Sequence, residues 1–359
     1  MKIFLCTWPF GAGGDPRDME RGMKLYLGDA QGRAGGDLQA DCLKVSSSPA
    51  IYLGAPTGPA IAVDLPAIGR KVQHAQRPLR LLLSYHYYKD ENVKELLDSC
   101  FKDQPVDIFA DSGAYSSWTT GTPITVKEYA DWLLRWGDLL TCAAALDVIG
   151  NAQGSWDQTG ELKDLLQGKL PNLDLIPVVH INDRDPWSWL SRYVGAGYKY
   201  IGIAPNAVKG NQKLKGAWMA QGFKRRPPDV KYHGFGVTSW DHLLAFPWYS
   251  VDSSSWTSGF RYAQLALFDS KRGCFVNVAM GQKKSLLENA GLLAQYGLRP
   301  TTAQAHSYDR DLLCGVCVES WQRAEEWLSC RSSLSLSLSL SLSTLSEAAA
   351  AGPLTTPQF

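Results

Sequence analysis

The sequence has almost no net charge and no long apolar run. Its 359 residues carry 36 lysine and arginine side chains against 35 aspartate and glutamate side chains, which argues against a protein that coats nucleic acid with its whole surface. No apolar run approaches the roughly 20 residues that span a bilayer. Residues 1–10 are too short a segment, and too soon broken by Pro9, for a signal peptide. We therefore expect a cytoplasmic protein without a membrane partner.

A dense cysteine framework is also lacking. The eight cysteines are scattered along the chain, so reduced thiols are expected. An apolar fraction of 45% at this length supplies a full core and excludes a disordered, collagen-like or coiled-coil protein. The end of the chain differs, because serine and leucine alternate over residues 333–343. We predict that residues 332–359 form a disordered, dispensable tail and that residues 1–331 hold the fold.

Strand-like runs alternate with helical segments, and this alternation predicts the architecture. The runs are apolar at consecutive positions, as in residues 81–83, which is typical of parallel strands buried on both faces. They lie at residues 2–8, 79–87, 106–110, 142–148, 173–181, 198–204, 231–238 and 248–251, with helices expected at 128–140, 156–167, 186–194 and 308–328. Eight runs predict an α/β fold, a (β/α)8 TIM-type barrel with an N-terminal insertion at about residues 28–69 and a C-terminal helix. An open doubly wound sheet is the alternative, but residues 11–14 lack the glycine fingerprint that it requires.

Polar residues stand where the predicted strands end, which is the face of a barrel that carries catalysis. Asp111, Asp147 and Asp252 each lie at or just past the end of an apolar run, where a carboxylate is costly unless it is paired or used. For any one of them, helix capping explains the position as well. Three at one mouth favour metal binding or glycosyl chemistry with one carboxylate as nucleophile and another as acid or base.

The histidines favour glycosyl chemistry over a metal. The six histidines form no pair with metal-ligand spacing, and His86 and His180 stand at strand ends. Each of these two either touches substrate or supports the site through hydrogen bonds. His233 lies inside a predicted strand and is interpreted as a core residue.

The order of several short motifs resembles that of the tRNA-guanine transglycosylases. Residues 111–115, Asp-Ser-Gly-Ala-Tyr, resemble the family motif Asp-Ser-Gly-Gly-Phe. The later segments follow in the family's order, at residues 145–147 (Ala-Leu-Asp), 201–204 (Ile-Gly-Ile-Ala), 234–237 (Gly-Phe-Gly-Val) and 249–253 (Tyr-Ser-Val-Asp-Ser). The resemblance covers roughly residues 79–256. It is greatest to the phage and bacterial branch, the DpdA-like DNA-guanine transglycosylases, which put 7-deazaguanines into DNA.

The resemblance implies a pentosyltransferase that exchanges bases. Asp252 would be the nucleophile that holds the sugar covalently, Asp111 the general acid and base, and Asp147 the group that recognises the purine. The other substrate-side positions that it implies are Ser112, Gly113, Tyr115, His180, Gly202 and His86. Tyr115 replaces the motif's phenylalanine, and would stack on the purine or pack at the barrel rim. The implied partners are DNA, with tRNA as the alternative, and a free 7-deazaguanine base; a phage-encoded chain would act in the host cytoplasm.

Two departures from the family bear on the substrate. Members that act on tRNA carry a zinc site of three cysteines and a histidine, whereas this chain offers only Cys314 and Cys317, two of the four ligands that a structural zinc needs. We interpret this segment as an amphipathic helix with buried thiols and expect no metal or other cofactor, which favours DNA over tRNA. The family's base-recognising glutamine is replaced near His180, so the identity of the base stays open.

A basic stretch between residues 206 and 231 is the electrostatic feature that suits a polymer substrate. It contains Lys209, Lys213, Lys215, Lys224, Arg225 and Arg226. These side chains would follow phosphates at the barrel mouth, or form a solvated helix face. A base-excising glycosylase with water as acceptor, and a non-catalytic barrel that binds nucleic acid, remain alternatives to base exchange.

Overall fold

A computed structural model of the chain describes residues 1–7, 16–17, 19–21, 23, 78–102, 104–205, 211–300 and 310–350, with side chains of the last helix described as far as Arg331. The insertion predicted at residues 28–69 lies outside the described residues. Among the described helices, none is long and apolar enough to cross a membrane.

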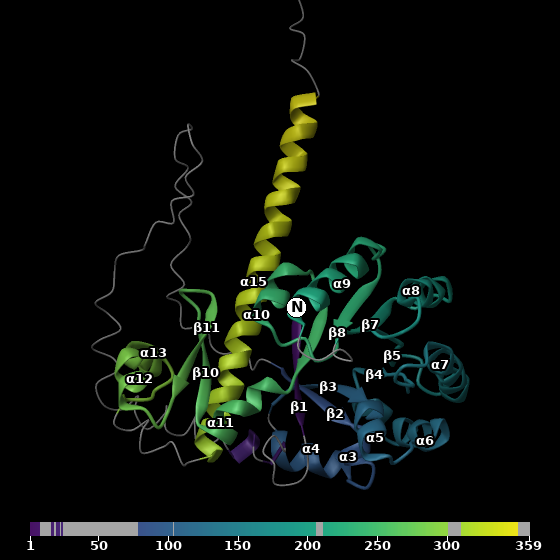
Figure 1. Cartoon of the computed structure of the whole chain (residues 1–359), viewed down its shortest axis with the longest axis horizontal. Helices are drawn as coiled ribbons and strands as arrows, with labels where there is room; N and C mark the ends of the chain where they lie inside the picture. The colour runs from purple at the N-terminus through teal and green to yellow at the C-terminus, as the bar shows by residue number, and fades with distance from the viewer. Residues whose placement is uncertain are drawn as a thin grey trace, which may run out of the picture.

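Parallel strands form a closed barrel at the centre of the molecule (Figure 1). The strands are β1 (Lys2–Thr7), β2 (Leu79–Ser84), β3 (Val106–Asp111), β4 (Cys142–Ala144), β5 (Asp174–Ile176), β6 (Val178–His180), β7 (Tyr200–Ala204), β8 (Lys231–Gly234) and β9 (Ser250–Ser253). Their order is β5-β4-β3-β2-β1-β9-β8-β7-β6. Only Pro177 separates β5 from β6, so the two edges of this sheet are halves of one strand. The predicted (β/α)8 barrel is therefore confirmed, with eight strands when β5 and β6 are counted as one.

Pro177 interrupts the fifth barrel strand because it has no N–H to donate to the neighbouring strand. Its carbonyl still accepts a hydrogen bond from the Gly202 N–H at 2.8 Å, and the Ile176 carbonyl accepts one from the Ala145 N–H at 2.8 Å. The neighbouring strands on both sides, β4 and β7, are thus hydrogen-bonded to the residues at the break, and this closes the barrel.

Helices cover the outside of the barrel between successive strands. They are α3 (Tyr85–Tyr88), α4 (Val93–Phe101), α5 (Ala114–Thr120), α6 (Val126–Trp136), α7 (Ala152–Leu166), α8 (Pro186–Gly195), α9 (Gln212–Lys224) and α10 (Trp240–Ala245). The helix predicted at residues 128–140 begins two residues earlier, where Thr125 and Glu128 form a capping box. The helices predicted at 156–167 and 186–194 correspond to α7 and α8.

The segment after β9 holds elements that the sequence did not reveal. A short helix, α11 (Ser258–Tyr262), leads into the antiparallel hairpin of β10 (Gln264–Asp269) and β11 (Cys274–Ala279), followed by α12 (Lys283–Glu288) and α13 (Ala290–Gln295). The long helix α15 (Arg310–Ala350) packs between this hairpin and the barrel, and its C-terminal part projects beyond them (Figure 1).

Helix α15 continues through the serine–leucine alternation, where we predicted a helix end near residue 328 and then disorder. The backbone is helical to Ala350, because no proline or glycine interrupts the sequence between Gly315 and Gly352. Residues 351–359 lie outside the described part, and the dispensability of the segment after Arg331 stays a prediction.

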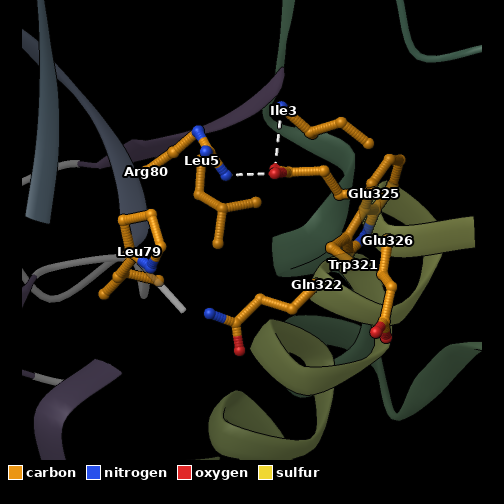
Figure 2. Close-up of a pocket in the computed structure, with 9 residues that line it drawn as sticks. Ile3, Leu5, Leu79, Arg80, Trp321, Gln322, Glu325 and Glu326 are labelled. Atoms are coloured by element: carbon orange, nitrogen blue, oxygen red, sulfur yellow. Dashed lines mark hydrogen bonds and ion pairs between the residues drawn. The ribbon is translucent and has the colours of Figure 1, made fainter. Parts of the chain in front are cut away.

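A partly buried ion pair connects α15 to the start of the barrel strands (Figure 2). Glu325 forms an ion pair with Arg80 of β2 and accepts a hydrogen bond from the Ile3 N–H of β1 at 3.0 Å. Arg80 also lies 3.2 Å from Asp107 of β3. Burial raises the pKa of Glu325, while Arg80 and the Ile3 N–H oppose that shift. A cavity of about 270 Å³ lies beside the pair, lined also by Trp321.

Arg80→Ala is expected to lower the free energy of unfolding by about 1–3 kcal/mol at neutral pH, because it leaves the partly buried Glu325 carboxylate without its partner. Without Arg80, the pKa of folded Glu325 rises further above its unfolded value. The loss should therefore be smaller at about pH 4, where the carboxyl is protonated. Denaturant unfolding at both pH values measures this. Lys284→Ala is the control: its pair with Glu288 is exposed, so we expect a change below about 0.5 kcal/mol.

Candidate active site

The carboxyl ends of the barrel strands surround a cavity of about 450 Å³, within the size range of small-molecule sites. The predicted carboxylates Asp111, Asp147 and Asp252 all line it, together with His180 and Tyr115. Further lining residues are Cys6, Ser84, Tyr87, Trp118, Asn182, Phe235 and Gly236. The cavity therefore brings together side chains from strand ends that are far apart in the sequence.

Asp252 on β9 has hydrogen-bond partners at both carboxylate oxygens. Its Oδ1 accepts the Gly236 N–H at 2.7 Å and lies 3.3 Å from His233 Nε2, which can donate in the tautomer protonated there. Its Oδ2 accepts a longer, weaker bond from the Cys6 thiol at 3.2 Å. These donors stabilise negative charge on the carboxylate, and they leave Oδ2 more weakly held than Oδ1.

His233 supports Asp252 from inside the barrel. It is fully buried, as interpreted from the sequence, and it stacks on Phe109 with ring centroids 4.5 Å apart. Its Nδ1 lies 2.7 Å from the Ser250 hydroxyl, which is bonded in turn to the Tyr200 hydroxyl. If Tyr200 donates to Ser250 and Ser250 donates to Nδ1, the Nε2 hydrogen points at Asp252. Sequence reasoning missed this role; the signal was a polar residue within the strand next to β9.

The pKa of the Asp111 carboxyl is raised strongly above its usual value. Protein surrounds it except where it borders the cavity, and this burial raises its pKa to about 7. The charges of Asp147 and Asp252 act in the same direction, while the nearby Ser84 hydroxyl and a hydrogen bond from the Gly113 N–H, at 3.0 Å from Oδ2, oppose it. Asp111 can therefore both release and accept a proton near neutral pH.

Asp147, which follows β4 next to the Asp111 strand, is paired with His180 at the end of β6. His180 Nε2 lies 2.7 Å from Asp147 Oδ2, and the Ser112 hydroxyl donates to Oδ1 at 3.4 Å. Burial alone would lower the pKa of His180, but the hydrogen bond and charge of Asp147, with the charge of Asp183, raise it overall. A carboxylate has about four acceptor positions, so Asp147 can accept further hydrogen bonds from a ligand.

Four of the predicted substrate-side residues support the cavity without lining it. Ser112 is buried and bonds to Asp147. Gly202 leaves room for the ring of Phe235, which would lie 2.4 Å from an added Cβ. His86 packs against Tyr87, with ring centroids 4.9 Å apart, and Tyr87 rather than His86 reaches the cavity.

Gly113, the fourth of these, begins α5 in the left-handed conformation, at φ 77°. A Cβ there would meet His86 Cβ at 2.5 Å. We expect Gly113→Ala to lower the free energy of unfolding by about 2–4 kcal/mol. Gly121→Ala is the matched control, since Gly121 has φ 69° and open space around it; it should cost only about 1 kcal/mol. Equal losses in chemical denaturation would contradict the close contact with His86.

The predicted basic stretch is divided between the two ends of the barrel. Helix α9 begins beyond the end of β7, on the cavity side, and ends before the start of β8, about 20 Å away. Lys213 is exposed in its first turn, whereas Lys215 is buried. The remaining described residues, Lys224, Arg225 and Arg226, lie at the far end, and Lys209 lies outside the described residues. Among the described residues of the stretch, a phosphate-binding role at the mouth stays a prediction for Lys213.

Cys314 and Cys317 are buried on α15, as the amphipathic pattern predicted. The described part of the chain contains no group of three or more histidine, cysteine or acidic side chains placed to hold a metal ion.

No protein-family model matches this chain, and no curated protein matches it either. Fold and site together define an α/β barrel with three aspartates in one cavity at the carboxyl ends of its strands.

Proposed function

We propose that this protein is a glycosyltransferase that replaces guanine in DNA by a 7-deazaguanine through a covalent bond between Asp252 and the sugar. The observation that carries the proposal is the contrast between two carboxyls in one cavity. Asp252 accepts hydrogen bonds from the Gly236 N–H and the Cys6 thiol, which fix its carboxylate beside the cavity, as a nucleophile requires. Asp111 has a pKa of about 7, as a general acid and base requires.

The exchange has two steps. First, Asp252 Oδ2 attacks the anomeric carbon of the nucleotide, the bond from that carbon to the guanine nitrogen breaks, and Asp111 gives its proton to the departing base. Second, Asp111 takes a proton from the incoming base, whose nitrogen attacks the same carbon and releases Asp252. Each step ends with the charges needed for the next, and two inversions retain the configuration of the sugar. Oδ2 is the attacking atom because it has the weaker donor.

Asp147 gives the site its preference for guanine-like bases. Its oxygens can accept hydrogen bonds from the N1–H and the exocyclic amine that guanine and 7-deazaguanines share. Adenine presents an acceptor in place of the N1–H, which would leave the carboxylate facing a lone pair. The contacts with His180 and Ser112 hold Asp147 in place for this role.

The test of the proposed function uses the full chain, labelled guanine and three polymers: duplex DNA, single-stranded DNA and tRNA. Incorporation of label into DNA supports the proposal. Incorporation into tRNA alone would show that the protein exchanges bases in tRNA instead of DNA. Release of free base without incorporation would show a base-excising glycosylase instead. Binding without either reaction would show a non-catalytic barrel. Mass spectrometry of nucleosides, from DNA of cells that express the chain beside a 7-deazaguanine supply, identifies the inserted base.

His233 should act on the reaction through Asp252. We expect His233→Leu to slow exchange by about 10- to 100-fold, because Asp252 Oδ1 loses a donor and the Ser250 hydroxyl loses its acceptor. His233→Gln, which retains a side-chain N–H, should recover part of the rate. The measurement is kcat beside KM for the oligonucleotide: kcat should fall while KM changes little, since His233 does not line the cavity. A fall that parallels lost thermal stability in both variants would indicate a structural role alone.

A further inference from the structure

Helix α5 forms one wall of the catalytic cavity and carries two exposed aromatic side chains. Tyr115 is 57% exposed and Trp118 is 63% exposed, and both line the cavity. They stand three residues apart on one helical face, with ring centroids 6.0 Å apart and planes inclined by 51°. Two neighbouring exposed aromatic side chains at the rim of a cavity form an apolar patch, and such patches mark interaction sites.

The rest of α5 offers little that could bind a charged ligand. Its seven residues, Ala114–Thr120, include no charged side chain. The hydroxyl hydrogens are already used within the region: Ser116 donates to the Tyr87 hydroxyl at 3.2 Å, and Thr120 donates to the Ser116 carbonyl at 2.8 Å. The helix therefore presents aromatic faces, which suit a flat, uncharged partner.

The position of α5 relative to Asp111 indicates which ligand its aromatic side chains would bind. Asp111 ends β3 and α5 begins three residues later, so the aromatic wall rises directly from the reacting groups towards the mouth. Trp118 stands about one helical turn above Ala114. A polymer with one nucleotide in the cavity has this wall beside its path out of the mouth. The nucleotide next in the strand is unpaired if its neighbour has been extruded, and its base has a free face for stacking.

We propose that Trp118, with Tyr115 beside it, is a stacking site for the nucleobase adjacent to the one exchanged. The site takes an unpaired base of a nucleic acid strand, and it tolerates different bases because every base has an aromatic face. This inference rests on the proposed function and adds to it a preference for substrates whose flanking base is unpaired.

The test measures binding of the full-length protein to fluorescent single strands of about ten nucleotides with one central guanine. A second strand has abasic sites on both sides of the guanine. We expect Trp118→Ala to weaken binding of the first strand roughly tenfold and to leave binding of the abasic strand unchanged. Trp118→Phe, which retains an aromatic ring, should bind nearly as well as the wild type. An RNA strand of the same sequence, run in parallel, determines whether the site distinguishes the two sugars.

Tyr262→Ala is the matched control, because Tyr262 on α11 is 66% exposed and does not line the cavity; it should bind both strands normally. Equal affinity of Trp118→Ala and the wild type for the first strand overturns the proposal, as does an equal loss for both strands. The proposed function fails separately, if the wild type binds the first strand but exchanges no base; a wild type that binds neither strand overturns the stacking site. A surface change such as Trp118→Ala should leave thermal unfolding nearly unchanged.

Discussion

Asp252→Asn is expected to reduce base exchange by on the order of 10⁴-fold, because an uncharged amide of the same size cannot attack the anomeric carbon. The amide oxygen of the asparagine can still accept the Gly236 N–H, and its NH2 group can donate to the Cys6 sulfur, a weak acceptor, so the cavity should keep its shape. Binding of DNA is expected to persist, since the substitution removes reactivity rather than contact area. Asp252→Ala should likewise lose exchange and keep DNA binding.

The proposed covalent intermediate gives this prediction a direct readout. Wild-type protein incubated with DNA, then denatured, should yield an adduct of protein and strand, and Asp252→Asn should yield none. Asp174→Asn is the matched control, since Asp174 is an exposed aspartate at the start of β5, away from the catalytic end. Exchange at a normal rate in Asp252→Asn would exclude Asp252 as the nucleophile. An adduct that persists in this variant would place the covalent bond elsewhere.

Asp111→Asn should have the second largest effect, a loss of about 10²- to 10⁴-fold in exchange, because the departing base loses its proton donor. The pH dependence separates this role from a structural one. Adduct formation requires protonated Asp111, so its rate in the wild type should be constant below pH 7 and fall about tenfold per pH unit above it. The second step requires the ionised form and should show the opposite slope. The variant should lack both slopes; a wild-type profile flat between about pH 6 and 8 would contradict the assignment.

The same carboxyl should weaken the fold as the pH rises. Its folded pKa of about 7 lies above the value near 4 of an unfolded aspartate, so the folded state binds the proton more tightly. Its contribution to stability is therefore complete below about pH 4 and is lost as the pH rises to 7. Thermal unfolding should show Asp111→Asn gaining stability relative to the wild type between about pH 5 and pH 8. A gain in stability together with a loss of exchange would show that Asp111 is kept for its activity although it lowers the stability of the fold.

The barrel could be predicted because its strands are buried on both faces. Consecutive apolar residues make each barrel strand recognisable in the sequence. The polar residue at the carboxyl end of a strand then indicates where the cavity lies. This is why Asp111, Asp147 and Asp252 were found. Cys6 stands at the same edge, at the end of β1, but a cysteine does not differ from its apolar neighbours, so no polarity signal marked it.

The missed features depend on packing between distant segments. The hairpin of β10 and β11 is short, and part of its stability comes from α15, whose Ser320 hydroxyl bonds the Phe268 N–H and the Ala266 carbonyl. His233 is tolerated inside a strand because Ser250 and Asp252 on β9 supply hydrogen-bond partners for its two ring nitrogens. The division of the basic stretch follows from the length of α9, since a helix of 13 residues carries its last residues to the far end of the barrel.

The attachment of β1 to α15 has a consequence for biosynthesis. The Ile3 N–H meets Glu325 across 322 residues of sequence, and Ser329 also bonds the Met1 carbonyl. Strand β1 thus receives its support from α15 only after Glu325 has been synthesised, and it pairs with β9 only after residue 253. Until then the growing chain exposes an unpaired, apolar edge of β1. Expression under conditions that slow aggregation of incomplete chains should therefore favour a good yield.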